Sequence, residues 1–252
     1  MKEKSEILYG IHPVCEALKA GKRTILDVCI IDGKPSNRIG RILRLAESKG
    51  VQVNRVTPDR LRSLTGTEVH QGVIARVSAY PFSDLSDIAR TGGAGGSEPM
   101  VLLLDTIKDP QNLGAIIRTA LCAGIGGIII PKDRSASPSP AVSKASAGAL
   151  EHTAISRVTN LVGAIKFFKN EGFWISGLDG TVDRSIYEAD FVFPMALVVG
   201  SEEKGIRPLV RKQCDFIVSI PQTGKVSSLN ASVAAGIAMY EAMRQKTHKR
   251  TE

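Results

Sequence analysis

The chain has 252 residues, 43% of them hydrophobic, which suffices for one large or two small domains whose cores need no disulfide or metal. No apolar run approaches the roughly 18 residues of a membrane-spanning helix, and the charged first residues lack the apolar stretch of a signal peptide. The four cysteines form no CxxC pair and the four histidines form no HExxH motif. We therefore expect a cytoplasmic protein with reduced cysteines in its core and no bound metal.

The net charge of +8 favours a polyanionic partner. Its distribution is uneven, because residues 1–80 hold 14 Lys and Arg against 8 Asp and Glu. Residues 81–98 are net negative by 2, and residues 99–252 are net positive by 4. The greatest density of positive charge therefore lies in the first third of the chain, where we expect contacts with a polyanion.

The first 80 residues alternate helical and strand patterns, which predicts a compact α/β module. The expected helices cover 12–20, 37–49 and 57–64, and the expected strands cover 25–31, 51–56 and 72–77. In 37–49 the apolar residues recur at helical spacing, and Arg38, Arg41, Arg44 and Lys49 fall mostly on the opposite side. Two interpretations of this basic face stay open, a solvated surface and a surface that contacts RNA.

Residues 81–98 change in character, because four glycines, three serines and a negative charge balance replace the regular patterns. This composition predicts a flexible linker and therefore a domain boundary. The chain contains no GxGxxG dinucleotide fingerprint and no GxxxxGKS phosphate loop.

Residues 99–252 predict a second, regular α/β domain in which apolar strands alternate with helices. The expected strands are 100–104, 126–130, 173–178, 195–199 and 216–220, and the expected helices are 115–123, 141–150, 160–170, 206–212 and 230–245. This alternation indicates a mostly parallel sheet that binds ligands at the carboxyl ends of its strands.

Three loops at these strand ends carry polar or glycine residues that a plain connection does not need. In the first, Asn112 comes just before the expected helix and is a candidate N-cap, and Arg118 follows on an otherwise apolar helix. In the second, Gly200 and Gly205 bracket Glu202, with Glu203 interpreted as a solvated neighbour. The third loop, 220–230, leads into a helix with small first residues, which indicates tight packing or close approach to a ligand.

The three loops together resemble the three motifs of the SpoU family of RNA ribose 2′-O-methyltransferases, in the SPOUT class. The motif residues are Asp109, Pro110, Asn112, Gly114, Arg118 and Thr119, then Gly200, Glu202 and Gly205, then Ile220, Pro221, Ser228, Leu229, Asn230 and Ser232. Their order and spacing match the family over all of 99–245. The N-terminal module resembles the substrate-binding domain of the subgroup that methylates a guanosine of 23S rRNA, through Tyr9, Gly10, Glu16, Ala17, Leu18, His70, Gln71 and Gly72.

The resemblance implies an architecture that the spacing by itself does not. It implies domains at 1–80 (RNA substrate binding, like ribosomal protein L30e) and 99–252 (methyltransferase), joined by the linker 81–98. The C-terminal parallel sheet would contain a deep trefoil knot, and the protein would be a homodimer through this domain. The cofactor would be S-adenosylmethionine, held by main-chain groups at Gly200, Ile220 and Leu229.

The resemblance also implies the residues that carry out the reaction. Arg118 matches the family's catalytic arginine, and because arginine side chains in general stay protonated, we expect electrostatic stabilisation of the developing alkoxide and no proton abstraction. Asn112, Glu202, Ser228 and Asn230 match the motif positions that would hold the substrate and this arginine. For Asn112 and Ser228, helix capping is the alternative role.

Several functions remain possible from the sequence. The leading one is methylation of a guanosine 2′-OH in 23S rRNA, and related enzymes that act on tRNA or confer antibiotic resistance carry the same motifs. A function of another class, a non-catalytic RNA-binding or ribosome-assembly factor, would use the basic surface without methyl transfer.

Overall fold

The computed structural model describes residues 5–91, 98–225 and 228–248 of the chain. The chain divides into two compact units, which we describe separately. The first combines Met1–Pro81 with Pro138–His152, and the second combines Phe82–Ser137 with Thr153–Glu252. The segment 138–152 was expected in the second domain, yet its helix α6 (Pro140–Ala145) and 3-10 helix η2 (Ala149–Glu151) pack on elements of the first unit.

The first unit is built on a four-stranded mixed sheet in the order β1-β4-β2-β3. Its elements are β1 (Ser5–Tyr9), α1 (Ile11–Ala20), β2 (Ile25–Ile31), α2 (Asn37–Ser48), β3 (Val53–Val56), α3 (Pro58–Thr65) and β4 (Val73–Ser78). Helices α1 and α2 cover one face of the sheet, where Leu18 and Ile42 are fully buried, and Leu61 of α3 packs on the other face.

The second unit is a six-stranded sheet in the order β10-β8-β9-β5-β6-β7, with every pair of neighbours parallel. Its strands are β5 (Met100–Asp105), β6 (Gly127–Pro131), β7 (Ile155–Val158), β8 (Trp174–Leu178), β9 (Met195–Gly200) and β10 (Phe216–Val218). Its helices are α4 (Leu85–Thr91), α5 (Pro110–Cys122), α7 (Leu161–Asn170), α8 (Pro208–Arg211) and α9 (Ala231–His248), with the 3-10 helix η3 at Ile186–Glu188.

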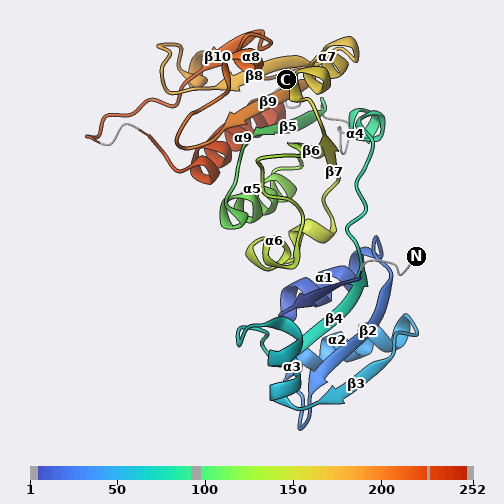
Figure 1. Cartoon of the computed structure of the whole chain (residues 1–252). Coiled ribbons are helices and arrows are strands. Elements are labelled where there is room, and N and C mark those ends of the chain that lie inside the picture. Colours follow the sequence, from blue (N-terminus) through green and yellow to red (C-terminus); the bar gives the residue numbers. More distant parts are fainter. Residues whose placement is uncertain (1–4, 92–97, 226–227, 249–252) are drawn as a thin grey trace. The chain divides into compact units, whose positions relative to one another are not determined.

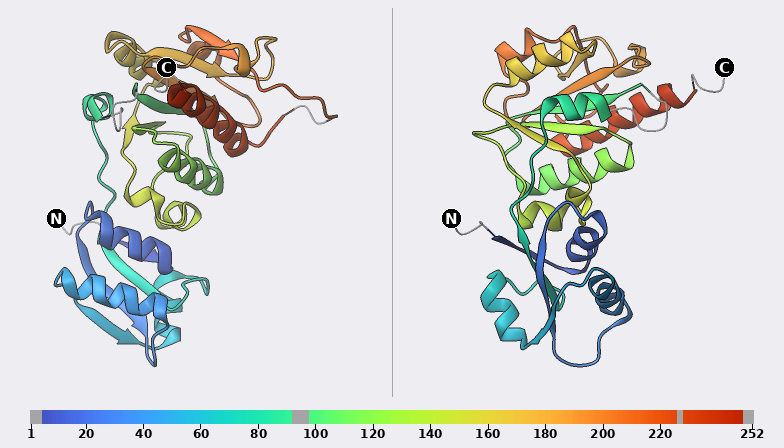
Figure 2. Two further views of the ribbon diagram at one scale, coloured as in Figure 1. Left: turned by 180° about the vertical axis from the view of Figure 1, so that it is seen from behind. Right: turned by 90° about the vertical axis from the view of Figure 1, so that its right-hand side faces the viewer.

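Helices cover both faces of this sheet (Figure 1, Figure 2). On one face, α4, α7 and α8 bury Ile88, Phe168 and Val210 against the strands. On the other face α5 and α9 pack side by side. Because both faces are covered, β5 and β6 are buried along their whole length, as their continuous apolar sequences predict.

Some boundaries differ from those expected. Helix α4 lies inside the segment 81–98, because the apolar side chain of Ile88 is fully buried in the core; the glycine-rich part, 92–97, lies outside the described residues. Helix α5 begins at Pro110, five residues before the expected start, because Asp109 caps it and proline suits its first turn. The helix expected up to residue 150 is interrupted at Ala147 and Gly148, both of positive φ. Strands β1 and β7 were not expected.

The cysteines are free thiols in the structure. Cys15 and Cys29 are buried, as expected, whereas Cys122 is exposed on α5 because it lies on the side of the helix away from the sheet. Burial raises the pKa of the Cys214 thiol to about 12. Among the described helices, none is long and apolar enough to cross a membrane.

Candidate active site

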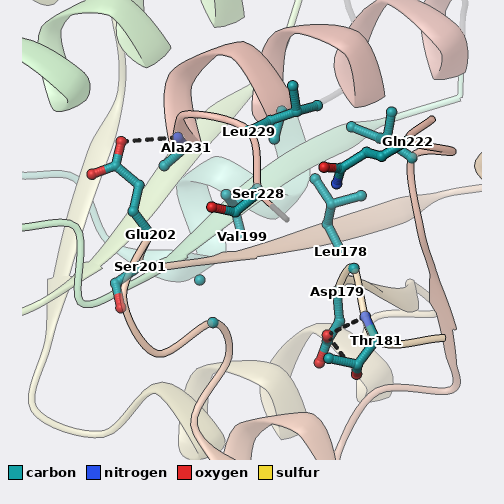
Figure 3. A pocket seen from close by; sticks show the side chains of 15 residues that line it. Leu178, Asp179, Thr181, Val199, Ser201, Glu202, Gln222, Ser228, Leu229 and Ala231 are labelled. Atoms are coloured by element: carbon teal, nitrogen blue, oxygen red, sulfur yellow. Dashed lines mark hydrogen bonds between the residues drawn. The ribbon is translucent and has the colours of Figure 1, made fainter. Parts of the chain in front are cut away.

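A cavity of about 390 Å³ lies at the carboxyl ends of β8 and β9, where parallel strands are expected to present a ligand site. One part of its wall is apolar and consists of Leu178, Val199, Ile220, Leu229, Ala231 and Ala234. The remaining lining residues are polar or glycine: Asp179, Gly180, Thr181, Gly200, Ser201, Glu202, Gly205, Gln222 and Ser228. Figure 3 shows these side chains around the cavity, with Glu202 on the side opposite Asp179 and Thr181.

The loop after β9 forms one wall of the cavity and is closed on itself. Ser201 and Gly205 exchange two backbone hydrogen bonds, of 3.2 and 2.8 Å. A Cβ atom on Gly200 would lie 2.1 Å from the carbonyl carbon of Gly205, so the loop can close this tightly only with glycine at position 200. Glu202 projects from this loop, and its position therefore depends on the tight closure.

Glu202 lies at the centre of a hydrogen-bonded cluster formed by three separate segments: the loop after β9, the first turn of α5 and the start of α9. Its Oε1 accepts from Nδ2 of Asn112 at 3.0 Å, from Nδ2 of Asn230, and from the backbone N–H of Ala231 at 3.1 Å. Nδ2 of Asn230 also donates to Oδ1 of Asn112 at 3.0 Å. Three residues that lie 90 and 28 positions apart in the chain are thus held together at one edge of the sheet.

Asn230 both belongs to this cluster and begins helix α9. Its Oδ1 accepts from the backbone N–H of Ser232 at 2.9 Å and from the Ser232 hydroxyl at 2.6 Å, as an N-cap does. The expected capping role of Asn112 is wrong, because α5 begins earlier and the side chain of Asp109 accepts from Gln111 N instead. Asn112 therefore lies in the first turn of α5, with its side chain available to Glu202.

The remaining predicted residues divide into two groups. Ser228 and the three expected cofactor residues Gly200, Ile220 and Leu229 all line the cavity. Arg118 does not line the cavities of this unit described here, and within the described residues it makes no hydrogen bond or ion pair. Six residues separate it from Asn112, which turns it about 240° around α5, so its exposed side chain projects from a different side of the helix.

A second cavity, of about 180 Å³, lies on the other side of Glu202. It is lined by Thr106, Ile107, Lys108, Asp109, Asn112, Ser201, Glu202 and Glu203. Ser201 and Glu202 line both cavities, so the wall between the two spaces carries a carboxylate. Glu203, expected as a solvated charge, is exposed but also contributes to this second cavity.

Asp105, at the end of β5, is a residue that the motif analysis missed. It is fully buried, and its carboxylate accepts from the backbone N–H of Arg207 at 2.8 Å and from Nε of Arg207 at 2.6 Å. These bonds fasten the chain just after the Gly200–Gly205 loop to the strand beside it, since Asp105 pairs with Gly200 in the sheet. An acidic residue that ends a fully apolar strand is the sequence signal that would have revealed it.

Asp179 and Thr181 form the polar end of the larger cavity and were also missed. Burial alone would raise the pKa of Asp179, but hydrogen bonds from Thr181 and the Arg211 guanidinium outweigh it and hold the pKa below its usual value. The carboxylate is therefore ionised at neutral pH. Its signal in the sequence is an LDGT loop directly after a strand.

The larger cavity has the size and composition of a cofactor site. Its volume falls within the roughly 300–1,000 Å³ of small-molecule sites, and its apolar wall with a few polar groups is typical of them. The apolar side suits a planar base, whereas Asp179, Thr181, Glu202 and Ser228 supply partners for hydroxyl and ammonium groups. Among the described residues, no group of three or more His, Cys, Asp or Glu is placed to hold a metal ion.

The fold and the site together define an α/β protein with a cavity of nucleoside size at the carboxyl edge of a parallel sheet, next to a carboxylate and carboxamide cluster. Comparison with known proteins identifies the family of this α/β protein. Residues 99–240 match the model of the SpoU rRNA Methylase family, and residues 7–83 match the domain described as RNA 2′-O ribose methyltransferase substrate binding. The chain belongs to the SpoU rRNA methylase family.

Relatives resemble this chain over its whole length. It is 40% identical to the 23S rRNA (guanosine-2′-O-)-methyltransferase RlmB of Salmonella typhimurium, over 96% of this chain and 100% of the relative. It is 37% identical to the putative TrmH family tRNA/rRNA methyltransferase YacO of Bacillus subtilis, over 98% of both chains. The structure of the SpoU methyltransferase AviRb from Streptomyces viridochromogenes with AdoMet superposes with a TM-score of 0.81 at 26% identity, covering 97% of this chain and 91% of that one.

Proposed function

We propose that this protein transfers a methyl group from S-adenosylmethionine to the ribose 2′-OH of a guanosine in 23S rRNA. The observation that carries the proposal is the Glu202 cluster, which lies between a cofactor-sized cavity and a second, smaller cavity. Methyl transfer needs two bound groups that meet at one point, and this arrangement supplies it. The 40% identity to a guanosine-2′-O-methyltransferase over that protein's full length supports the choice of substrate.

The larger cavity is the proposed cofactor site. The main-chain groups of Gly200, Ile220 and Leu229 bind the adenine and its neighbouring atoms, so small or apolar side chains suffice there. Asp179 and Thr181 accept from and donate to the polar remainder of the molecule. When bound, the cofactor supplies an already activated methyl group on a sulfonium, for which no metal is needed.

The protein's own residues align the 2′-OH and stabilise its oxygen as it loses a proton. Asn112, Glu202 and Asn230 fix the wall between the two cavities, and Ser228 lies at the cavity side of that wall. In this proposal the guanidinium of Arg118 provides the positive charge that favours the developing alkoxide. Alignment of the two reacting groups contributes further, because it replaces a bimolecular encounter.

Arg118 reaches the site in this proposal from a second copy of the chain. Its exposed side chain is directed away from its own Glu202 cluster, and α5 and α9 expose Leu121, Val233 and Tyr240. Exposed apolar side chains on two adjacent helices support a homodimer through this domain. The proposal also includes a trefoil knot in the C-terminal segment and an L30e-like N-terminal module. Its domain boundaries are 1–80, 81–98 and 99–252. Action on ribosomal RNA implies a cytoplasmic location.

The proposal is tested with purified protein, S-adenosylmethionine and unmethylated 23S rRNA, by mapping 2′-O-methylated nucleotides. Arg118→Ala is expected to lose at least about 100-fold in turnover, as removal of a transition-state donor does, while calorimetry shows unchanged cofactor binding. A mixture of the Arg118→Ala and Glu202→Ala chains is expected to regain activity, because a mixed dimer keeps one intact site. Methylation of tRNA alone would show that the substrate is tRNA and not 23S rRNA. Absence of cofactor binding would favour a non-catalytic RNA-binding factor.

A further inference from the structure

Helix α2 of the first unit presents three arginines on one exposed face. Ser36 caps the helix by accepting from Ile39 N, and Ile42 and Ala46 are buried against the sheet. Arg38, Arg41 and Arg44 lie at intervals of three residues on the solvent side, and we call them the α2 arginine stripe. Over six residues an α-helix rises about 9 Å, so the three guanidinium groups form a short row along the helix.

The α2 arginine stripe is not neutralised within the described part of the chain. None of its three side chains makes an ion pair or a hydrogen bond with a described residue, whereas four other arginines of the same unit pair with carboxylates: Arg23, Arg55, Arg62 and Arg76. The acidic residues that pair with other cations are Glu6, Glu16, Asp27, Asp32, Glu68 and Glu151. The carboxylates of the unit are thus largely engaged elsewhere, and the positive potential of the stripe remains.

We propose that the α2 arginine stripe is the surface that binds the phosphate backbone of the RNA substrate. The inference rests on the proposed function, since it assigns the RNA of that reaction to one helix face. Arginine presents a planar fork of donors that matches phosphate oxygens in pairs, and it is less strongly hydrated than lysine. A row of about 9 Å on long side chains is long enough for its three guanidinium groups to reach successive phosphates of one strand.

The surroundings of the stripe favour an extended polyanion over a small anion. No side chain forms a wall at Gly40, where an added Cβ atom would meet only the Arg44 guanidinium, at 3.9 Å. Lys34 and Lys49 are exposed at the two ends of α2 and extend the row of positive charge. Such an open, linear set of cations matches a strand of phosphates, which requires charge along a line and no pocket.

The experiment measures RNA binding by the full-length protein as a function of salt, with a fragment of 23S rRNA that the protein methylates. Each phosphate contact contributes about 0.7 to 0.9 to the slope of log K against log salt. The Arg38→Gln, Arg41→Gln, Arg44→Gln triple variant is therefore expected to lose about 2 to 3 from this slope. The matched control is Arg55→Gln, Arg62→Gln, Arg90→Gln, which removes the same charge from arginines that already pair with carboxylates.

The outcomes separate the two proposals. A smaller slope in the stripe variant alone, with cofactor affinity by calorimetry unchanged, supports the α2 surface. An unchanged slope in the stripe variant, or an equal loss in both variants, overturns it, the second because it would indicate only a diffuse field. A loss of RNA binding that does not depend on salt also overturns it, since phosphate contacts release counterions. Failure of the unmodified protein to bind cofactor or methylate RNA would instead contradict the proposed function.

Discussion

The first unit contains a buried ion pair whose removal gives a sharp test of how the unit is held together. The side chains of Arg23 and Glu151 are 1% and 2% exposed, and Nε of Arg23 lies 3.1 Å from Oε2 of Glu151. Arg23 also pairs with Glu6 at 2.8 Å and lies over the ring of Tyr80, while Ser143 donates to Glu151 at 2.8 Å. The pair therefore joins the loop between α1 and β2 to the segment 138–152, which comes much later in the chain.

The perturbation is Arg23→Met, which keeps the apolar stem and removes the charge. Glu151 then keeps the Ser143 hydroxyl but loses the cation beside it, and removal of one partner from a buried pair costs about 3–5 kcal/mol. Glu6 loses a partner too, but its side chain is 25% exposed and water replaces much of that interaction. We therefore expect the transition of the first unit to lose about 3 kcal/mol at pH 8.

The cost depends on pH, because protonation of Glu151 can remove the unpaired charge. Burial already raises the pKa of Glu151 above 4.5, against the opposing effect of Arg23, and loss of Arg23 raises it further. A carboxyl whose pKa is raised in the folded state stabilises the fold fully below its unfolded pKa, and this stability is lost as pH rises through the folded pKa. The variant is therefore expected to differ less from the unmodified protein at pH 5.5 than at pH 8.

The measurement is urea unfolding of the full chain at both pH values, followed by circular dichroism. Arg62→Met is the control, because its partner Glu68 is 75% exposed and such a pair contributes at most about 1 kcal/mol. A loss below about 1 kcal/mol for Arg23→Met at pH 8 would refute the assignment of a buried pair. An equal loss at both pH values would contradict the role given to Glu151.

Two further predictions concern the loop after β9, which forms one wall of the proposed cofactor cavity, and the strand beside it. Gly200→Ala places a Cβ atom 2.1 Å from the Gly205 backbone and must displace the loop. We expect cofactor binding to weaken at least about tenfold by calorimetry, because a displacement that costs about 1.4 kcal/mol of binding free energy gives a tenfold change. Gly163→Ala, whose Cβ would meet nothing nearer than 4.0 Å, is the control, and equal effects of the two variants would contradict the steric argument. Asp105→Asn places an amide N–H donor opposite a donor of Arg207. We expect this variant to lower the free energy of unfolding by about 1–3 kcal/mol in thermal unfolding. Asp87→Asn, at an exposed carboxylate, is the control and is expected to change the free energy of unfolding little.

The fold of the second unit was largely predictable, because strands buried on both faces are continuously apolar. The continuous apolar sequences of β5 and β6 predict strands that are buried on both faces. The alternation of strands and helices alone places their carboxyl ends on one edge of the sheet. Short or half-exposed elements were less visible. In β7 only Ile155 and Ser156 are buried, and α4 has a single fully buried side chain, Ile88, beside a glycine-rich stretch.

The packing of 138–152 within the first unit has a physical cause that local patterns do not contain. This segment is contiguous with β6 and β7 in the chain, yet its packing is decided by contacts more than 100 residues away. His152 lies 2.9 Å from Glu16, and Lys22 donates to the carbonyl of His152 at 2.7 Å. A Cβ atom on Gly148 would lie 2.8 Å from Glu16, so this position packs too closely for any side chain. Neither charge pairing nor close packing between distant segments can be deduced from periodicity.

The same distinction applies to the site. Periodicity and motif order place Asn112, Glu202 and Asn230 at strand ends, but they do not say that one oxygen of Glu202 accepts hydrogen bonds from both of the other segments. This convergence explains why Asn230 is an amide: its oxygen caps α9 while its nitrogen donates to Glu202. An aspartate would cap the helix equally well and repel Glu202, whereas a serine would reach only one of the two. The start of α9 and the wall between the two cavities are therefore fixed by one side chain, so the geometry of the proposed site and the fold of the C-terminal segment depend on each other.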